Sequence, residues 1–156
     1  MGVVVIESAS DNDIAEITVL IEQTIKTCID VTDDEANDLV AHSVYNMLLW
    51  KRSKQGSVHL VCRLEGRIVG VVLVKEFWNL TSLFVDPDFQ ARGIGQKLVQ
   101  EALSQCRGMS PKRAVKLSSS TYAQDFYRAM GFKQVGEPQP LPGGCIPFEF
   151  SFNSTS

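Results

Sequence analysis

The sequence lacks the features that would place the chain in a membrane or on a secretory route. No apolar run approaches the roughly 20 residues of a membrane-spanning helix. The start, Met1 to Glu7, carries no charged leader and no cleavage site, so we expect a first strand there and not a signal peptide. Ile6 stands where a myristoylation motif needs Ser or Thr. These absences favour a cytoplasmic protein without a membrane partner.

Paired cysteines and an excess of positive charge are also missing. The four cysteines, Cys28, Cys62, Cys106 and Cys145, are scattered without paired spacing, so we expect reduced, mostly buried thiols and neither a disulfide framework nor a metal site. The 15 basic residues are outnumbered by 18 acidic ones, which gives a formal net charge of −3. This balance argues against nucleic acid as the main partner, because proteins that bind nucleic acid are usually basic.

The length of 156 residues suits one domain, which we place at residues 1–152, with a frayed tail at 153–156. Apolar residues at helical spacing predict amphipathic helices, and β-branched runs predict strands. The expected order is a strand at 3–6, helices at 14–25 and about 36–48, strands at 58–64, 67–75 and 79–85, a helix at 94–106, a strand at 114–118, a helix at 123–130, and strands at 132–135 and 146–152. This order predicts a mixed α/β fold, with antiparallel strands first and crossover units later.

A glycine-rich turn, Gln90 to Gly95, lies between the third predicted strand of that run and the helix that follows. The first turn of a helix leaves backbone N–H groups without intrahelical partners, and these groups form the positive end of the helix dipole. Gly93 and Gly95 have no Cβ, so a ligand can approach the backbone closely. Arg92 adds a full positive charge. The turn therefore predicts an anion-binding loop suited to a phosphate or pyrophosphate.

Other phosphate-binding loops fit this turn poorly. The dinucleotide-binding fingerprint needs a third glycine where Leu98 stands, and the nucleotide P-loop needs a Gly-Lys-Ser/Thr triplet that the chain does not contain. The string Gln-x-x-Gly-x-Gly at 90–95, preceded by Leu-Phe-Val-Asp-Pro, closely resembles the GNAT superfamily of acyl-CoA-dependent N-acetyltransferases. A second segment, Ala123 to Phe132, resembles the other shared GNAT segment, in which a helix carrying Phe-Tyr ends in Gly-Phe. The resemblance covers nearly the whole chain.

The resemblance implies a fold, a co-substrate and a set of residues. The fold is the GNAT α/β fold, a central mixed, mostly antiparallel sheet flanked by about four helices. The co-substrate is acetyl-CoA, with no metal. By position in the family pattern, the residues expected to contact acetyl-CoA are Leu83, Phe84, Val85, Gln90, Ala91, Arg92, Gly93, Ile94, Gly95, Gln96, Ser119, Gln124 and Tyr127. Of these, the backbone groups of residues 83–85 should bind the pantetheine arm, where two strands splay apart. Residues 90–96 should bind the pyrophosphate.

Tyr127 matches the family's tyrosine near the cofactor sulfur, which protonates the leaving thiolate in many members. The chemistry agrees, because amine attack on a thioester expels a thiolate and a phenol can donate a proton to it. Phe126 and Tyr127 point about 100° apart on a helix, so one can pack inward while the other faces a cleft. The alternative is an aromatic helix face that simply packs the core.

The sequence identifies the general base and the acceptor less clearly. Some family members carry a glutamate where this chain has Asn79, which cannot act as a base. Glu76 lies nearby, and His59 has a suitable pKa range, although a lone histidine on a strand is more often a structural surface residue. In the family the acceptor pocket corresponds to about Ile25 to Val40, Trp78, and Pro140 to Phe148 here. The first of these segments is acidic, which would attract a cationic amine or be no more than a solvated helix start.

The sequence thus predicts transfer of an acetyl group from acetyl-CoA to a primary amine of a small molecule or peptide, by direct attack in a ternary complex. No suitably placed Cys–His pair argues for an acyl-enzyme. A non-catalytic acyl-CoA-binding sensor remains the alternative, because no base is evident. A toxin-type transferase acting on aminoacyl-tRNA is disfavoured by the acidic balance. A homodimer is plausible by resemblance, and the sequence leaves it open.

Overall fold

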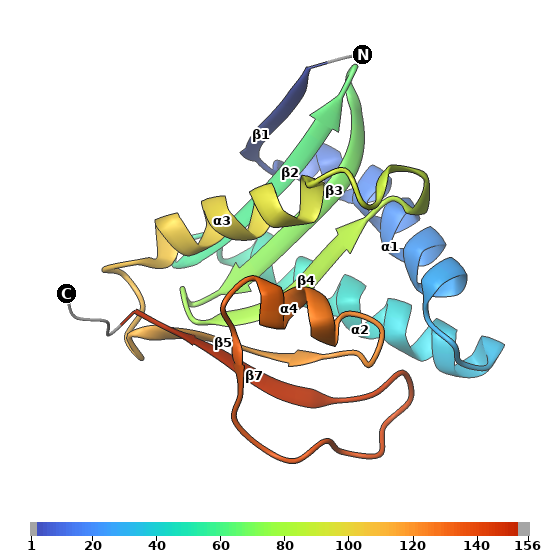
Figure 1. Ribbon diagram of the computed structural model, residues 1–156. Coiled ribbons are helices and arrows are strands. Elements are labelled where there is room, and N and C mark those ends of the chain that lie inside the picture. The colour runs from blue at the N-terminus through green and yellow to red at the C-terminus, as the bar shows by residue number, and fades with distance from the viewer. Residues whose placement is uncertain (1–2, 153–156) are drawn as a thin grey trace.

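A seven-stranded sheet forms the centre of the computed structural model, which describes residues 3–152 (Figure 1). The strands are β1 (Val4–Ser8), β2 (Ser57–Leu64), β3 (Arg67–Lys75), β4 (Asn79–Val85), β5 (Ala114–Ser119), β6 (Lys133–Gln134) and β7 (Ile146–Ser151). They lie in the order β1-β2-β3-β4-β5-β7-β6. Every neighbouring pair is antiparallel except β4 and β5. The predicted mixed, mostly antiparallel sheet is confirmed.

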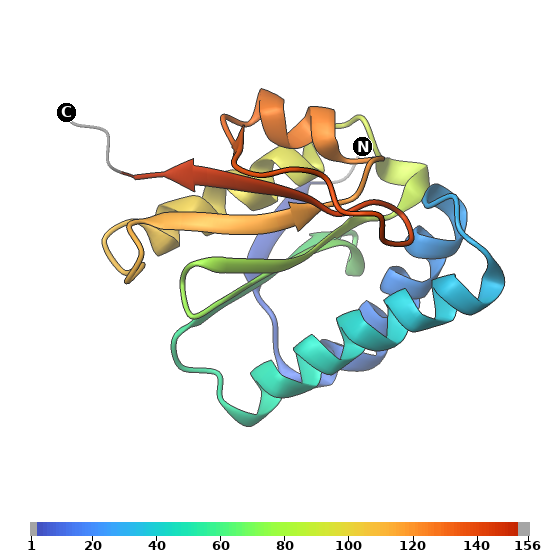
Figure 2. The same ribbon diagram turned by 90° about the horizontal axis from the view of Figure 1, so that it is seen from below.

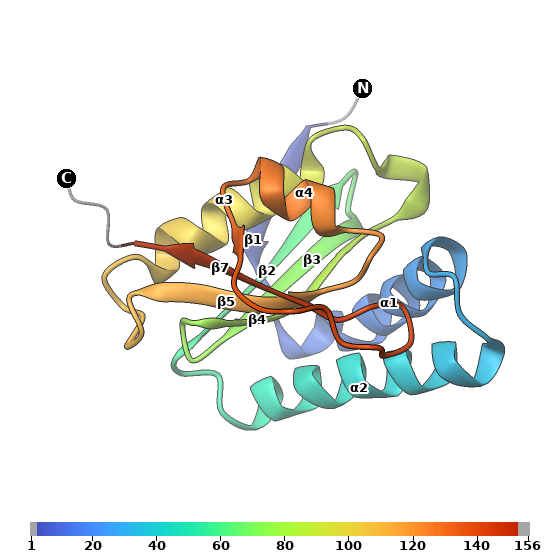
Figure 3. The ribbon, with the colours of Figure 1, turned by 60° about the horizontal axis from the view of Figure 1, so that its bottom comes forward.

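Within residues 3–152, four α-helices cover the two faces of the sheet. They are α1 (Ile14–Cys28), α2 (Asp33–Arg52), α3 (Ile94–Cys106) and α4 (Gln124–Ala129), with single 3₁₀ turns η1 (Asp11–Asp13) and η2 (Pro87–Phe89). Figures 2 and 3 show α1 and α2 on one face, with α3 and α4 on the other. Within the described residues, no helix combines the length and the apolar character needed to cross a membrane.

The two faces of the sheet carry separate apolar clusters. Apolar residues of α1 and α2, among them Ile17 and Met47, pack on Val61, Val71 and Leu73 of the sheet. The helices α3 and α4 pack on the opposite face, in a cluster that includes the side chain of Tyr127. Because helices cover both faces, β2 and β3 are buried along almost their whole length and do not alternate between inward and outward residues.

Helix α2 begins at a capping box. The Thr32 side chain accepts from the N–H of Glu35, and the Glu35 carboxylate accepts from the N–H of Thr32. This helix runs from Asp33 to Arg52, so it extends beyond both ends of the predicted helix at about 36–48. The helix α3 ends at Cys106 as predicted, and the tail at 153–156 lies outside the described residues.

A gap opens between β4 and β5 just beyond the start of β4. The two strands pair only at Asn79 and Lys116, while β5 pairs with β7 along its whole length. Between β3 and β4 the register shifts, so that Thr81 is an extra residue in β4. Such a bulge bends its strand and increases the local twist. The bulge therefore lies where β4 starts to turn away from β5, and the expected splay of two strands is present.

Gly70 of β3 lets the start of α3 approach the sheet. A Cβ at this position would lie 2.8 Å from Cδ1 of Leu98 and 3.0 Å from Cγ2 of Ile94. Any larger residue would push the first turns of α3 outward. Sequence patterns did not single out Gly70, because its constraint comes from a helix that follows it by more than 20 residues.

His59 of β2 lies in the protein interior, which corrects the expectation of a surface residue. Its side chain is buried against Trp50, with ring centroids 4.2 Å apart and the planes 81° from parallel. The Nδ1 atom is buried without a hydrogen-bond partner. Burial lowers the pKa of His59 to about 4, and the Asp13 carboxylate opposes this shift only in part. His59 does not line the cavity described below, so it is not placed to act as a base.

We expect the stability of the protein to fall as the pH drops below 6.5. The unfolded chain binds a proton at His59 near pH 6.5 and the folded protein only near pH 4, so the unfolded state holds more protons between these values and is favoured as the pH falls. The loss in free energy of unfolding by pH 5 is about 2 kcal/mol. Urea unfolding at pH 7.5 and pH 5 measures it. His59→Phe keeps a ring against Trp50 and should lose much less; equal losses in both proteins would contradict the assignment.

Candidate functional site

A cavity of about 790 Å³ occupies the gap between β4 and β5. Its walls come from β4, β5, the loop before α3, the start of α4, the facing sides of α1 and α2, and the segment before β7. Figure 3 shows these elements around the open edge of β4. No Asp, Glu, Lys or Arg is among the described residues that line the cavity, and its titratable lining residues are Cys28, His42, Tyr122 and Tyr127.

The predicted anion-binding loop lies at one end of this cavity. Ala91 and Gly93 both adopt left-handed backbone conformations, with φ of 63° and 81°. The helix bonds of α3 start with the N–H of Lys97, which donates to the carbonyl of Gly93. Within residues 3–152, the backbone N–H groups of 90–96 have no hydrogen-bond partner. A run of free N–H groups in a loop that includes left-handed residues, at the positive end of a 13-residue helix, favours an anion.

A buried aspartate holds the loop against the sheet. The Asp86 side chain is almost fully buried and accepts hydrogen bonds from Arg67 at 2.7 Å and from the N–H of Asp88 at 2.9 Å. The guanidinium groups of Arg67 and Arg92 lie over the ring of Phe89, 5.3 and 5.1 Å from its centre. Arg92 is exposed and is not among the residues that line the cavity. Its charge therefore flanks the free N–H groups from outside.

The inner edge of β4 offers a second set of backbone groups. The N–H of Asp86 donates to Val69 of β3, so the carbonyl of Val85 points the other way, into the gap. By the same alternation, the backbone groups of Leu83 face the gap and those of Phe84 face β3, where Phe84 pairs with Val71. All three residues are among those that line the cavity.

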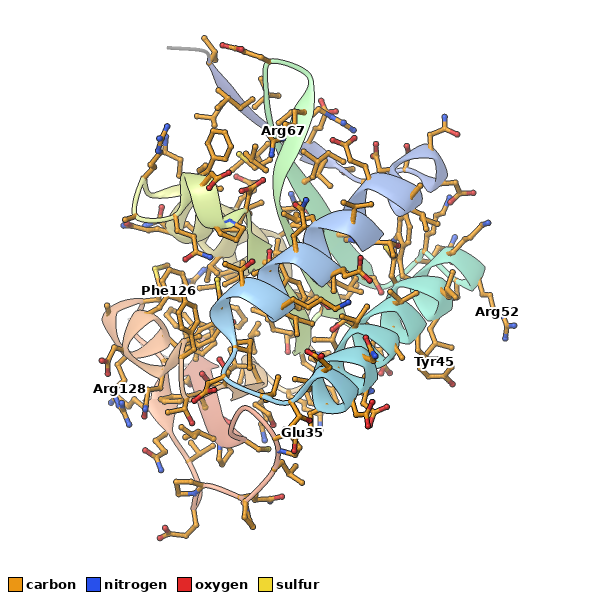
Figure 4. All side chains as sticks on the ribbon, turned by 90° about the vertical axis from the view of Figure 1, so that its right-hand side faces the viewer. Glu35, Tyr45, Arg52, Arg67, Phe126 and Arg128 are labelled. Carbon is orange, nitrogen blue, oxygen red and sulfur yellow. The ribbon has the colours of Figure 1, made fainter. Side chains whose placement is uncertain are left out.

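Tyr127 lies at the inner wall of the cavity. Its side chain is 6% exposed and packs against Phe126, Phe132 and Phe148. Burial raises the pKa of the phenol, which keeps the hydroxyl protonated near neutral pH. In the described part of the chain the hydroxyl has no hydrogen-bond partner, yet it is not among the fully enclosed polar atoms, so it opens on the cavity. Figure 4 shows Arg128 of the same helix pointing away from the molecule and Phe126 pointing inward.

The Gln90 side chain links several walls of the cavity through hydrogen bonds. The Gln90 amide donates to the Val85 carbonyl at 2.9 Å and to the sulfur of Cys28 at 3.4 Å, and it accepts from the hydroxyl of Tyr122. Burial, and then a hydrogen bond with Cys28, raise the pKa of Tyr122. This link joins the end of α1, the anion-binding loop and the start of α4. Tyr122 was missed by sequence reasoning, because it stands 32 residues from Gln90.

The other predicted residues are divided between the cavity and the surface. Ser119 is buried, lines the cavity and donates its hydroxyl to the carbonyl of Ser120 at 2.7 Å. Gln124 is not a lining residue, and its amide oxygen accepts from Arg128. Trp78 lies outside the cavity under the ammonium group of Lys112. Glu76 is exposed in the turn between β3 and β4, away from the cavity lining.

The acidic segment before and at the start of α2 also lies outside the cavity lining. None of its carboxylates, from Asp30 to Asp38, is a lining residue. Asp33, Asp34 and Glu35 form the first turn of α2, where acidic side chains stabilise a helix through its dipole. The dipole of α2 thus accounts for these acidic residues without a ligand, and Asp33 also lines a separate pocket of about 290 Å³ beside Ile29.

Comparisons with known proteins agree with this geometry. The acetyltransferase (GNAT) domain family matches residues 27–144. A peptidyl-lysine N-acetyltransferase, YjaB of Salmonella typhimurium, is 35% identical over 71 residues, which are 40% of this chain and 47% of the relative. The [ribosomal protein bS18]-alanine N-acetyltransferase of Haemophilus ducreyi is 28% identical over 138 residues, 82% of this chain and 91% of the relative. The chain also matches less than half the length of three other curated relatives.

Among solved structures, the PaiA N-acetyltransferase of Thermoplasma acidophilum, crystallised with coenzyme A, shares the fold. Its TM-score is 0.78 at 16% identity, over 96% of this chain and 99% of that one. The family match spans the loop at 90–96, the splayed strands and Tyr127. The chain therefore belongs to the GNAT family of N-acetyltransferases.

Proposed function

We propose that the protein transfers an acetyl group from acetyl-CoA to a primary amine of a small molecule or peptide, by direct attack in a ternary complex. The observation that carries this proposal is a single cavity that joins the free N–H groups of 90–96 to the hydroxyl of Tyr127 and continues between α1 and α2. The volume of about 790 Å³ lies within the roughly 300–1,000 Å³ usual for small-molecule sites.

The residues fit acetyl-CoA in two respects. The N–H groups of 90–96 suit its pyrophosphate, and the edge of β4 at Leu83 and Val85 suits the amides of its pantetheine arm. The carbonyl of Val85 already accepts from the Gln90 amide and keeps a second lone pair for another donor. When bound, acetyl-CoA would supply the acetyl group as an activated thioester.

The chain's own groups provide the proton chemistry. The Tyr127 hydroxyl stays protonated and faces the cavity, so it can donate a proton to a thiolate. Free N–H groups at the edge of β4 can polarise a carbonyl as an oxyanion hole does. A covalent route through cysteine is disfavoured, because the contacts of the Cys28 sulfur are Gln90 and Tyr122, and neither is a base.

The first test combines binding and turnover. Acetyl-CoA at about 100 times its Kd should raise the free energy of unfolding by about 2.7 kcal/mol, which is roughly 5–10 °C in melting temperature for a chain of this size. Thiol release is then followed with amines, amino-acid amides and short peptides. A thermal shift with release on one acceptor class is the expected result. The absence of any shift in melting temperature would contradict the proposal. A shift without thiol release on any acceptor would favour an acyl-CoA sensor.

A further inference from the structure

The end of the cavity between α1 and α2 is uncharged. It is lined by apolar, hydroxyl and small residues, with one histidine and one cysteine: Thr24, Ile25, Cys28, Ile29, Leu39, His42, Ser43, Pro142, Gly143 and Gly144. We call this set the α1–α2 end. The end is partly open, since His42 and Pro142 are exposed, but its lining offers a charged group of a ligand no partner of opposite charge. The α1–α2 end therefore favours a ligand without a second charge beyond the reacting amine.

Hydrogen bonds from Lys75 to Asn46 and from Asn46 to His42 define the orientation of the His42 ring. The ammonium group of Lys75 can only donate, so the Asn46 amide oxygen, 3.3 Å away, must accept. This fixes which way the Asn46 amide points. Its NH₂ group, which can only donate, then faces Nε2 of His42 at 3.4 Å. Nε2 must be the acceptor, and in the neutral ring Nδ1 carries the proton.

The chemical role of His42 follows from this tautomer. Nε2 is engaged with Asn46 and is not free to take a proton from an attacking amine. Nδ1–H has no hydrogen-bond partner in residues 3–152, and the ring lines the α1–α2 end. His42 thus offers a donor to a ligand and not a base. Asn46 is buried and Lys75 is half-buried, while His42 is exposed, so its ring is accessible to a ligand that enters from solvent.

We propose that the α1–α2 end binds the acceptor as an amine with an otherwise uncharged body, and that His42 Nδ1–H donates to a carbonyl oxygen on that body. An amino-acid amide or the first residue of a peptide with an uncharged side chain has this chemistry. The inference rests on the proposed function for the identity of the reacting group. It names His42 as a binding residue, Asn46 and Lys75 as its positioning residues, and excludes polyamines as good acceptors.

The test uses four acceptors of similar size and three variants. Leucine amide has the proposed features, isoamylamine lacks the carbonyl, leucine adds a carboxylate, and lysine amide adds a second ammonium. For leucine amide, His42→Phe should raise KM about 5–50-fold with kcat within about twofold, because a lost hydrogen bond to bound substrate is uniform binding. Lys75→Met should do the same to a smaller extent. Tyr45→Phe, on the exposed side of α2 (Figure 4), is the matched control and should change neither.

The outcomes separate the role of His42 from other roles. An equal rise in KM for isoamylamine would show that no carbonyl is bound, and a fall in kcat with KM unchanged would show that His42 is a base. Faster turnover of lysine amide or leucine than of leucine amide would overturn the uncharged acceptor class. A purely structural role would lower the melting temperature of His42→Phe and shift KM for all four amines together.

A second measurement does not depend on turnover. The chain has two histidines, so ¹⁵N ring labelling gives two sets of signals, and His42→Phe identifies which set is His42. The expected result is the Nδ1–H tautomer in the wild type, mixed tautomers in Lys75→Met, and a shift of the His42 signals on adding leucine amide. An Nε2–H tautomer in the wild type would overturn the inference. Binding of leucine amide at His42 without thiol release would support the binding role of His42 and contradict the proposed acetyl transfer.

Discussion

Replacing Tyr127 with phenylalanine should lower kcat by ~10²–10⁴-fold, the range in which a general acid contributes, while the affinity for acetyl-CoA stays within about twofold. The phenol is the protonated group at the inner wall of the cavity, and burial raises its pKa. The ring would remain packed against Phe126, Phe132 and Phe148 after the change. Steady-state kinetics and a binding titration measure the two quantities separately.

The variant should fold as well as the wild type. The Tyr127 hydroxyl has no hydrogen-bond partner among the described residues, so its removal leaves no buried group unpaired. Tyr45→Phe, which removes a hydroxyl from the exposed side of α2, controls for the loss of a phenol as such. Unchanged kcat in Tyr127→Phe would show that the thiolate takes its proton from water. Equal loss of binding and turnover would instead point to a packing role.

The strands and the loop could be predicted because their constraints are local. The limits of β3, of β4 and of the C-terminal end of α3 agree with the predicted ones, since β-branched runs end at turn residues and α3 ends beside Gly108. The capping box at Thr32 and Glu35 likewise acts over three residues. The glycine-rich loop is predicted from adjacent positions, and Gly93 within it has a left-handed backbone conformation, with φ of 81°.

The burial of His59 and the contacts of the α1–α2 end could not be predicted from local patterns. His59 is enclosed because α2 brings Trp50 across β2, and strand periodicity carries no information on that contact. The acidic segment could be taken for an acceptor site because helix capping and ligand attraction favour the same residue types. The chain from Lys75 through Asn46 to His42 joins residues 29 positions apart. Such links depend on tertiary packing.

A single negative charge at the start of α3 should weaken acetyl-CoA binding strongly. Gln96 lies in the first turn of α3, is exposed and lines the cavity beside the free N–H groups. Gln96→Glu keeps the side-chain shape and places a carboxylate near the proposed pyrophosphate. At about 5 Å, repulsion between like charges near a protein surface costs roughly 1–3 kcal/mol, so Kd should rise about 5–100-fold.

The helix itself should gain from the same change. A carboxylate in the first turn stabilises a helix by about 0.3–1 kcal/mol, so the melting temperature without ligand should stay the same or rise. Weaker binding of acetyl-CoA would then not result from a loss of folded structure. Gln100→Glu is the matched control, because Gln100 is exposed on the same helix, one turn further along, and does not line the cavity. Its Kd should change by no more than about threefold.

Salt provides the decisive comparison between the two variants. In 1 M salt the screening length falls to about 3 Å, from about 10 Å at 0.1 M, so the difference in Kd between Gln96→Glu and the wild type should shrink markedly. A steric effect of the substitution would persist at high salt. Equal affinities of Gln96→Glu and Gln100→Glu at low salt would mean that the pyrophosphate is not bound at this helix start. The free N–H groups of 90–96 would then need another ligand, and the acetyl-CoA assignment would fail with them.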